Sequence, residues 1–430
     1  MTTLTRRSLL AALGLGALAV PLQGCSGVPD PSADAKGEPT SVAAALIDRR
    51  PGVLTPAVSA HLGVLAGRLA SLTATPTENF ALSPFSIASA LSMARNGAHG
   101  GTASGMDTVL GITDLDAHNR AMNALDQYLM SLHGPLEYGG GEITLRQANR
   151  VWLQQGLTVE QPFLDALALD YGAGVRLDDF TQSPEAARGR INGWVAEQTA
   201  GRIPTLFPQD SLTELTRLVL VNALYFKAAW MEELNEVGRR PFTLGSGTPE
   251  AVPMLAVGTH GWYEDATCQA TALQYQGGML SMTLIKPKAT VKATFDAWTK
   301  GGLDTLLASM DESQLVRLTF PEWKQRSTLT LRRPLTALGM GDAFTGRADF
   351  SGVTTAEPLT ISEVHHQVFV AVDKYGTEAA AATGIGVVGG SAPQEPRTLT
   401  LDRPFCWVIH DRDTRTPLFV GSVADPTAGA

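Results

Sequence analysis

The stretch Gly-Thr-Glu-Ala-Ala-Ala-Ala-Thr-Gly-Ile-Gly-Val-Val-Gly-Gly-Ser-Ala-Pro-Gln-Glu-Pro occupies residues 376–396, between two strand-like stretches at residues 364–372 and 398–410. A structureless segment of about 20 residues inside a compact domain is uncommon and is usually functional or mobile. Its residues are mostly small, and its first proline is Pro393. Such residues can enter a crowded sheet without losing ladder hydrogen bonds, but an alanine run is equally typical of a helix. The residues alone leave two interpretations open: an inserting strand, or a flexible surface loop with helical alanines.

If the segment is extended, its side chains alternate between two faces. One face then carries Thr377, Ala379, Ala381 and Thr383, and the other carries Glu378, Ala380 and Ala382. At about 3.3 Å per residue, residues 376–390 would span on the order of 50 Å, which is enough to run the length of a large sheet.

Outward from this segment, helical spacing of apolar residues dominates the first half of the chain and strand patterns dominate the second half. Helices are expected at about residues 57–73, 83–93, 102–110, 117–132, 160–170 and 184–199. Strands are expected at about residues 143–153, 218–230, 271–275, 280–285, 315–320, 364–372, 398–410 and 418–423. Because helices and strands do not alternate regularly, the pattern favours an α+β fold over a doubly wound sheet.

The composition excludes several classes of protein. The chain has 430 residues, of which 44% are hydrophobic and 17% charged, so it can bury a large core. Its 33 basic and 42 acidic residues give a net charge of -9, which argues against a nucleic-acid partner. Three cysteines cannot form a disulfide framework. The sequence leaves open whether Cys268 and Cys406 pair, and lone buried thiols are the expectation.

The first 24 residues have the features of an export signal. Arg6 and Arg7 precede an apolar run at residues 9–20, and Leu-Gln-Gly-Cys at residues 22–25 closes it. The tetrapeptide resembles a bacterial lipobox, in which Cys25 would be acylated, and the arginine pair resembles a twin-arginine signal. We therefore expect a signal peptide at residues 1–24, a polar tether and linker at residues 25–56, and a membrane-anchored lipoprotein at the cell surface or outside the cell. The residues do not decide between the twin-arginine and the general export route.

Motifs of enzyme chemistry are missing from the sequence. It has no His-Glu-x-x-His, no Walker loop and no Gly-x-Ser-x-Gly. His365 and His366 are adjacent, and on a strand they point to opposite faces, so they cannot chelate one metal. Gly384, Gly386 and Gly389 match a dinucleotide-binding pattern, but Pro393 and Pro396 argue against the helix that this pattern requires. We predict that the chain is not an enzyme and binds no cofactor or metal.

The segment that follows residue 375 resembles the reactive-loop hinge of inhibitory serpins, a family of serine protease inhibitors. The hinge residues are Gly376, Thr377, Glu378, Ala379, Ala380, Ala381, Ala382 and Thr383. Further stretches similar to serpins follow in the family's order: Asn-Phe-Ala-Leu-Ser-Pro-Phe-Ser-Ile at 79–87, Gly-Ala-His-Gly-Gly-Thr at 97–102, Ile-Asn-Gly-Trp-Val at 191–195, Leu-Val-Asn-Ala-Leu-Tyr-Phe-Lys at 220–227, Asp-Arg-Pro-Phe at 402–405 and Leu-Phe-Val-Gly at 418–421. The resemblance covers about residues 57–426 and implies a single serpin-like domain, with helices packed around a large central mixed sheet.

The resemblance also implies a mechanism. A serpin presents its loop, here about residues 376–396, as bait; a serine protease acylates one peptide bond, and the cleaved loop inserts into the central sheet as a strand. The partner is then the target protease in a covalent acyl complex, and the inhibitor is expected to be a monomer. Ser83, Ser86, Asn222 and His366 match positions where serpins form a polar cluster under the opening sheet; they would equally serve as hydrogen-bonded core residues.

Two features of the loop depart from the family's pattern. Lys374 stands where serpins often carry an acid that pins the loop, which puts that ion pair in doubt. The family's spacing from Gly376 points to Gly390-Ser391 as the attacked bond, whereas the spacing from Phe405 points nearer Pro393, so the bond lies within residues 387–392. Small apolar residues there predict an elastase-like or subtilisin-like target. A non-inhibitory serpin-fold protein that binds partners or serves as surface structure is the alternative.

Overall fold

The computed structural model describes residues 40–42, 48–52, 54–136, 141–378 and 395–429. All of these belong to the compact unit formed by residues 39–430. The predicted signal peptide, Cys25, hinge residues Ala379 to Thr383, and the candidate bond Gly390-Ser391 lie outside the described residues.

Helices form mainly in the first half of the chain, as predicted. They are α1 (Pro56–Thr73), α2 (Pro84–Arg95), α3 (Gly100–Leu110), α4 (Leu115–Ser131), α5 (Gln161–Tyr171), α6 (Pro184–Gln198), α7 (Val291–Trp298), α8 (Gly302–Ala308) and α9 (Arg332–Leu335). Local sequence sets their ends. The Ser83 Oγ atom accepts a hydrogen bond from the Ser86 amide at the start of α2, with Pro84 in the first turn. Gly111 ends α3 and Gly172 ends α5, each in the left-handed conformation that suits glycine.

Helices α2, α4 and α6 pack on a mixed sheet, which we call sheet A. Its strands follow the order β1-β5-β4-β6-β14-β13-β12, and β3 pairs with β4 at the side. Their bounds are β1 (Thr40–Val42), β3 (Gly134–Pro135), β4 (Glu142–Gln154), β5 (Val175–Asp178), β6 (Leu218–Ala229), β12 (Trp323–Thr330), β13 (Ile361–Val372) and β14 (Gly376–Thr377). Strands β6 and β13 run parallel, whereas β14 runs antiparallel to both of them.

A second sheet, which we call sheet B, follows the order β15-β11-β8-β9-β10-β16-β17-β2, and β7 pairs with β8. Its strands are β2 (Phe80–Leu82), β7 (Asn235–Thr243), β8 (Pro249–Glu264), β9 (Cys268–Gln274), β10 (Leu280–Pro287), β11 (Asp311–Pro321), β15 (Arg397–Thr400), β16 (Phe405–Asp411) and β17 (Pro417–Val423). The expectation of one strand over residues 398–410 is wrong: β15 and β16 are separate strands. Pro404 lies between them and has no amide hydrogen for a ladder.

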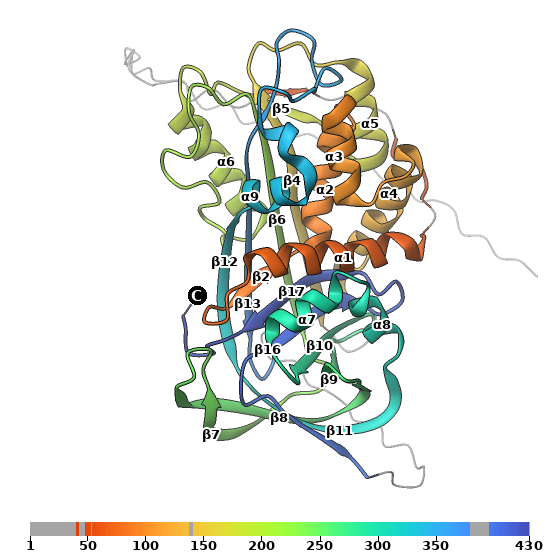
Figure 1. Ribbon diagram of the computed structural model, residues 1–430, viewed down its shortest axis with the longest axis vertical. Helices are drawn as coiled ribbons and strands as arrows, with labels where there is room; N and C mark the ends of the chain where they lie inside the picture. The colour runs from red at the N-terminus through yellow and green to blue at the C-terminus, as the bar shows by residue number, and fades with distance from the viewer. Residues whose placement is uncertain (1–39, 43–47, 53, 137–140, 379–394, 430) are drawn as a thin grey trace, which may run out of the picture. The chain divides into compact units, whose positions relative to one another are not determined.

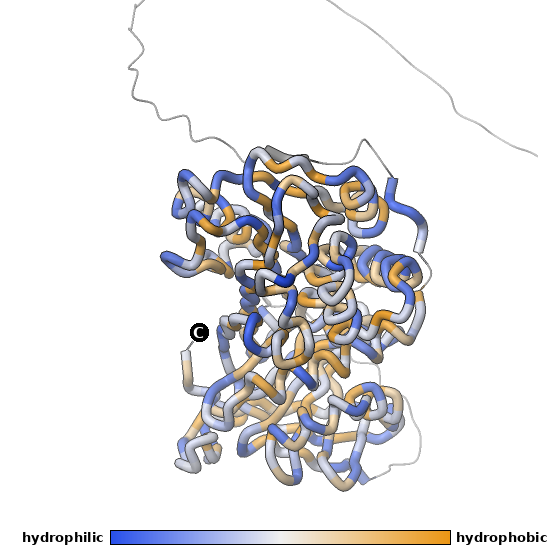
Figure 2. The backbone as a smooth tube through the Cα atoms, turned by 45° about the horizontal axis from the view of Figure 1, so that its top comes forward, coloured by the Kyte–Doolittle hydropathy of each residue, from blue (hydrophilic) through white to orange (hydrophobic). Residues whose placement is uncertain are grey.

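Strand β6 is buried on both faces, which explains why its sequence is almost continuously apolar. Leu220 and Leu224 belong to the main core, together with residues from the helices in the first half of the chain. Val219 and Val221 belong to a smaller core under α6. Figure 1 shows α2 to α5 on one side of β4 and β6, with α6 on the other, and in Figure 2 hydrophobic stretches recur along the packed helices and strands. The predicted α+β class is confirmed.

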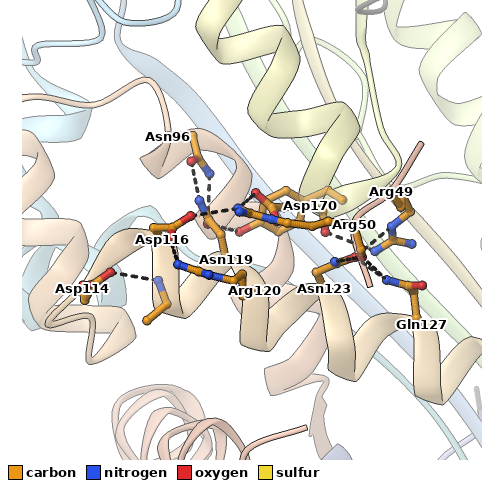
Figure 3. A network of polar contacts seen from close by, with 12 residues as sticks. Arg49, Arg50, Asn96, Asp114, Asp116, Asn119, Arg120, Asn123, Gln127 and Asp170 are labelled. Carbon is orange, nitrogen blue, oxygen red and sulfur yellow. Dashed lines mark hydrogen bonds and ion pairs between the residues drawn. The ribbon is translucent and has the colours of Figure 1, made fainter. Parts of the chain in front are cut away.

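The segment before α1 is held to the body by charged side chains (Figure 3). The Arg50 guanidinium makes a bidentate ion pair with Asp170, with Nη2 2.6 Å from Oδ2, and it lies 3.0 Å from Asp116. Arg49 donates to Asn123 at 3.1 Å and pairs with Asp126 at 2.8 Å. The Asp170 side chain is only 2% exposed. This segment therefore supplies the cation for a carboxylate that is almost fully buried in α5.

We expect Arg50→Met to lower the free energy of unfolding by about 3 kcal/mol, because it leaves the Asp170 carboxylate buried without a cation. Arg120→Met is the matched control: Arg120 pairs with Asp116 on the surface, where both side chains are more than half exposed, so its loss should cost at most about 0.5 kcal/mol. Urea unfolding of both variants measures this difference. Equal losses in the two variants would contradict the assigned role of Arg50.

Candidate functional site

The first residues of the predicted hinge already lie inside sheet A. In β14, Gly376 is opposite Ala229 of β6, and Thr377 is opposite Ala228. On its other side, Thr377 is opposite Val372 of β13. The chain therefore begins a new strand between two parallel neighbours, at the end where both neighbours finish.

Beyond this point, β6 and β13 pair directly with each other. Their described pairing runs from Ile361 opposite Leu218 to Gln367 opposite Ala223. Residues 224–227 and 368–371 lie between that pairing and β14. One further contact extends β14, where the Glu378 amide donates to the Ala371 carbonyl at 2.9 Å. Sheet A is thus joined directly at one end of these strands and separated by the hinge at the other.

Aromatic side chains fix the start of the hinge. Thr377 is 1% exposed, and its hydroxyl lies 2.7 Å from the hydroxyl of Tyr275. The Tyr275 ring stacks on Trp230 with centroids 4.5 Å apart. The Trp230 indole in turn donates to the Asp373 carbonyl at 2.9 Å. Thr377 therefore points into the core.

Glu378 interrupts the strand. Its φ of 54° is in the left-handed region, which is uncommon for a residue other than glycine. Its carboxylate accepts a hydrogen bond from the Tyr225 hydroxyl at 2.9 Å and pairs with Arg202 at 3.1 Å. The side chain is 3% exposed, and burial raises the pKa of this carboxyl. The chain leaves the strand conformation where Arg202 and Tyr225 hold this acid.

Lys374 takes part in an ion pair despite its departure from the family pattern. Its ammonium lies 2.8 Å from a carboxylate oxygen of Glu236 at the start of β7. Glu236 is 65% exposed, so the pair contributes little to stability.

The four residues predicted to form a polar cluster lie together where α2 packs on β6, beside β13, and all of them are fully buried. The Ser83 amide donates to His366 Nε2 at 2.8 Å, and the His366 Nδ1 atom contacts Asn222 Oδ1. The Asn222 amide donates to Ser86 Oγ at 2.7 Å and to Asn149 Oδ1 at 2.9 Å. The cluster links α2 to β6 and β13 at residues that are paired across the sheet, Asn222 and His366. Its role in opening the sheet stays a prediction.

These contacts require neutral His366. The Nε2 atom accepts from a backbone amide, so the ring proton must be on Nδ1, where it can donate to Asn222. A second proton would point at the Ser83 amide hydrogen. Burial lowers the pKa of His366 to about 3, which agrees with this tautomer.

Sequence reasoning missed three contributors: Asn149, Tyr275 and Arg202. Asn149 is a polar residue on the inward face of β4, which is a detectable irregularity in an apolar alternation. Tyr275 and Arg202 have no local signal, because their positions depend on which distant segments the fold brings to the hinge. The described Cys268 and Cys406 are free, buried thiols.

Among the residues described, no group of three or more His, Cys, Asp or Glu side chains is arranged to hold a metal ion. No helix in the same set is both long and apolar enough to span a membrane.

Comparisons with known proteins agree on one family. The sequence model of the family described as "Serpin (serine protease inhibitor)" matches residues 64–426. An uncharacterized serpin-like protein of Thermococcus kodakarensis is 35% identical over 359 residues, covering 82% of each chain. The leukocyte elastase inhibitor of Bos taurus is 34% identical over 371 residues, covering 82% of this chain and 94% of that protein. Among solved structures, the thermophilic serpin tengpin in its native state matches with a TM-score of 0.78 and 25% identity, covering 90% of this chain and all of that one. The predicted serpin-like fold is confirmed.

We expect the His366 contacts to make stability depend on pH. The unfolded state binds a proton at the ordinary pKa of about 6.5, whereas the folded state does so only near pH 3, so stability falls as the pH drops between these values. His366→Gln cannot titrate. The free energy of unfolding of the wild type should therefore fall by about 2 kcal/mol relative to that of the variant when the pH is lowered from 7 to 5, as measured by urea unfolding. His260→Gln, at an exposed site, is the control, and its free energy of unfolding should change with pH as that of the wild type does. If the difference in the free energy of unfolding between wild type and His366→Gln is the same at pH 7 and pH 5, the assignment of a neutral His366 is wrong.

Proposed function

The chain belongs to the serpin family, and from this premise we propose that it is a suicide-substrate inhibitor of serine proteases. The protease serine attacks a carbonyl in the loop, the peptide bond breaks, and its amine end leaves with a proton. The acyl ester that remains tethers the protease while the loop inserts into sheet A. The chain supplies no catalytic residue in this scheme.

One observation carries the proposal: β14 lies between β6 and β13 and runs antiparallel to both. It thus has the position and direction that an inserting strand needs. Each further residue of the loop would advance one residue back along β6 and β13. Thr383 lies six residues after Thr377, and six residues back from Ala228 and Val372 are Asn222 and His366. Full insertion would therefore have to break the direct pairing of Asn222 with His366.

The side chains of the predicted hinge suit this path. Thr377 faces the core, so alternation would bring Ala379, Ala381 and Thr383 to the same face. Small side chains can enter there with little displacement of the packed core, since cores tolerate added volume poorly. Glu378 would stay on the other face, beside Arg202.

We expect Thr377→Arg to convert the inhibitor into a substrate. A guanidinium at this buried position displaces the Tyr275 contact and would cost several kcal/mol to desolvate. Insertion should slow, so that the protease deacylates before it is trapped. Denaturing gels after incubation with protease should show cleaved chain in place of covalent complex.

Thr243→Arg, at an exposed site on β7, is the control and should keep the wild-type yield of complex. An unchanged yield with Thr377→Arg would count against strand insertion. Wild type that yields no complex with any protease of a broad panel would favour the non-inhibitory alternative.

The proposed target is an elastase-like or subtilisin-like protease. Residues 387–392 read Val-Val-Gly-Gly-Ser-Ala, with no basic residue until Arg397. Shallow apolar pockets accept such side chains, whereas a trypsin-like pocket leaves its carboxylate unpaired. The relative from Bos taurus, whose printed name is leukocyte elastase inhibitor, supports the same class.

Covalent complexes should therefore form with an elastase-like or subtilisin-like protease, and trypsin should be trapped weakly or not at all. Mass spectrometry of the released C-terminal fragment locates the bond, for which Gly390-Ser391 is the candidate. A fragment that begins at Thr398, together with rapid trapping of trypsin, would overturn the assignment.

The proposed location is the outer side of a membrane, through a lipid on Cys25. Cys25→Ala should move the protein from the membrane fraction to the soluble fraction, because the acyl chains supply the attachment. A variant that stays membrane-bound after a salt wash would rule out this anchor.

A further inference from the structure

Two arginines that form no ion pair with any described residue lie on the face of sheet A that is covered by α6. Arg150 and Trp152 project from β4, and Arg176 on β5 is paired with Trp152. Trp194 of α6 packs over them, with its ring centroid 6.2 Å from that of Trp152 in an edge-on arrangement. Figure 1 shows α6 beside these strands.

The two guanidinium groups share one aromatic ring. The Arg150 Cζ atom lies 5.6 Å from the Trp194 ring centroid, and the Arg176 Cζ atom lies 5.5 Å from it. Arg176 is also 5.4 Å from the Trp152 ring. Aromatic faces stabilise cations, but a ring face is a weaker hydrogen-bond acceptor for a guanidinium N–H than an oxygen atom is. Within the described part of the chain, the Nε atoms of both arginines still lack acceptors.

Three buried N–H donors in this cluster have no partner within the described part of the chain: Arg150 Nε, Arg176 Nε and Trp152 Nε1. Trp152 is fully buried and the two arginines are half-buried. Donors left without acceptors are costly. The set contains donors only, so an acceptor that carries several oxygens would satisfy it best.

The neighbouring Arg190 has a carboxylate partner, unlike Arg150 and Arg176 among the described residues. Arg190 on α6 donates through Nε to both carboxylate oxygens of Asp178 on β5, at 3.2 and 3.0 Å. The carboxylate next along β5 is thus already occupied. Neither Arg150 nor Arg176 has a carboxylate within ion-pair distance among the described residues. Burial, together with the nearby Arg176, lowers the pKa of Arg150, as expected for two like charges held together without a counterion.

We propose that Arg150, Arg176 and Trp152 form a binding site for a phosphate or sulfate oxyanion between α6 and strands β4 and β5. A tetrahedral oxyanion has the charge to offset both guanidinium groups, and planar guanidinium forks suit its oxygens. Bound there, the anion connects α6 to the strands on one side of the sheet opening. This site is independent of protease inhibition.

Isothermal titration of the full chain with inorganic phosphate, at an ionic strength held constant with sodium chloride, tests the site. We expect Arg150→Gln and Arg176→Gln each to weaken binding about tenfold or more, because each removes charge-assisted hydrogen bonds. Arg317→Gln removes the same charge from an exposed position on β11 and should leave the affinity unchanged. The indole N–H resonance of Trp152 should shift on titration of wild type, and circular dichroism should show that each variant is folded.

A parallel titration with short-chain polyphosphate separates the two sources of the group. If polyphosphate and inorganic phosphate bind with equal affinity per site, the ligand is a free ion. If polyphosphate binds much more tightly, the ligand is phosphate carried on a polymer. Both results support the site. The site would be overturned if phosphate bound no better than chloride. It would also be overturned if Arg317→Gln weakened phosphate binding as much as Arg150→Gln and Arg176→Gln do.

Discussion

The direct pairing of β6 with β13 is the constraint on which the rest of sheet A depends. It joins the two halves of the sheet from Leu218 to Ala223, and the hinge separates them at the other end. Between these regions, residues 224–227 of β6 and residues 368–371 of β13 are not paired with each other in the described ladder. Unpaired strand edges tend to recruit another strand, and here the chain itself supplies one, beginning at Gly376. Among the described residues, the hinge pairs with both neighbouring strands of sheet A at Thr377.

Polar groups are placed where this pairing begins and where the hinge leaves the sheet. His366, Asn222, Ser83 and Ser86 bind one another under the directly paired end, and Glu378 is bound by Tyr225 and Arg202 at the other. Buried hydrogen bonds are costly to leave unmade, so each set resists the movement of its strand.

Much of this could be read from the sequence, and the reasons are local. Ser83-Pro84 predicts the start of α2, and the apolar run at residues 218–230 predicts a strand, which the structure shows buried on both faces. The polar residues Ser83, Ser86, Asn222 and His366 were identifiable by their resemblance to a family. Pro404 marks the division of residues 398–410 into two strands in the sequence itself, but the prediction overlooked it. The position of β14 could not be predicted, since it depends on pairing with distant strands. For the same reason Arg202 and Tyr275 gave no signal, because contacts across more than a hundred residues follow from topology.

The chemistry of the polar cluster is compatible with the proposed insertion of the loop into sheet A. An apolar side chain in place of His366 would stabilise the closed pairing by packing alone. An incoming strand that displaced it would form no hydrogen bond with it to offset the lost packing. Hydrogen-bonded side chains differ, because an incoming hydroxyl can replace the bonds that are lost. In the proposed insertion the residue that arrives opposite Asn222 and His366 is Thr383, which carries such a hydroxyl. If insertion proceeds as proposed, a polar cluster at this position would hold the sheet closed, and Thr383 would replace part of the hydrogen bonding that is lost when the sheet opens.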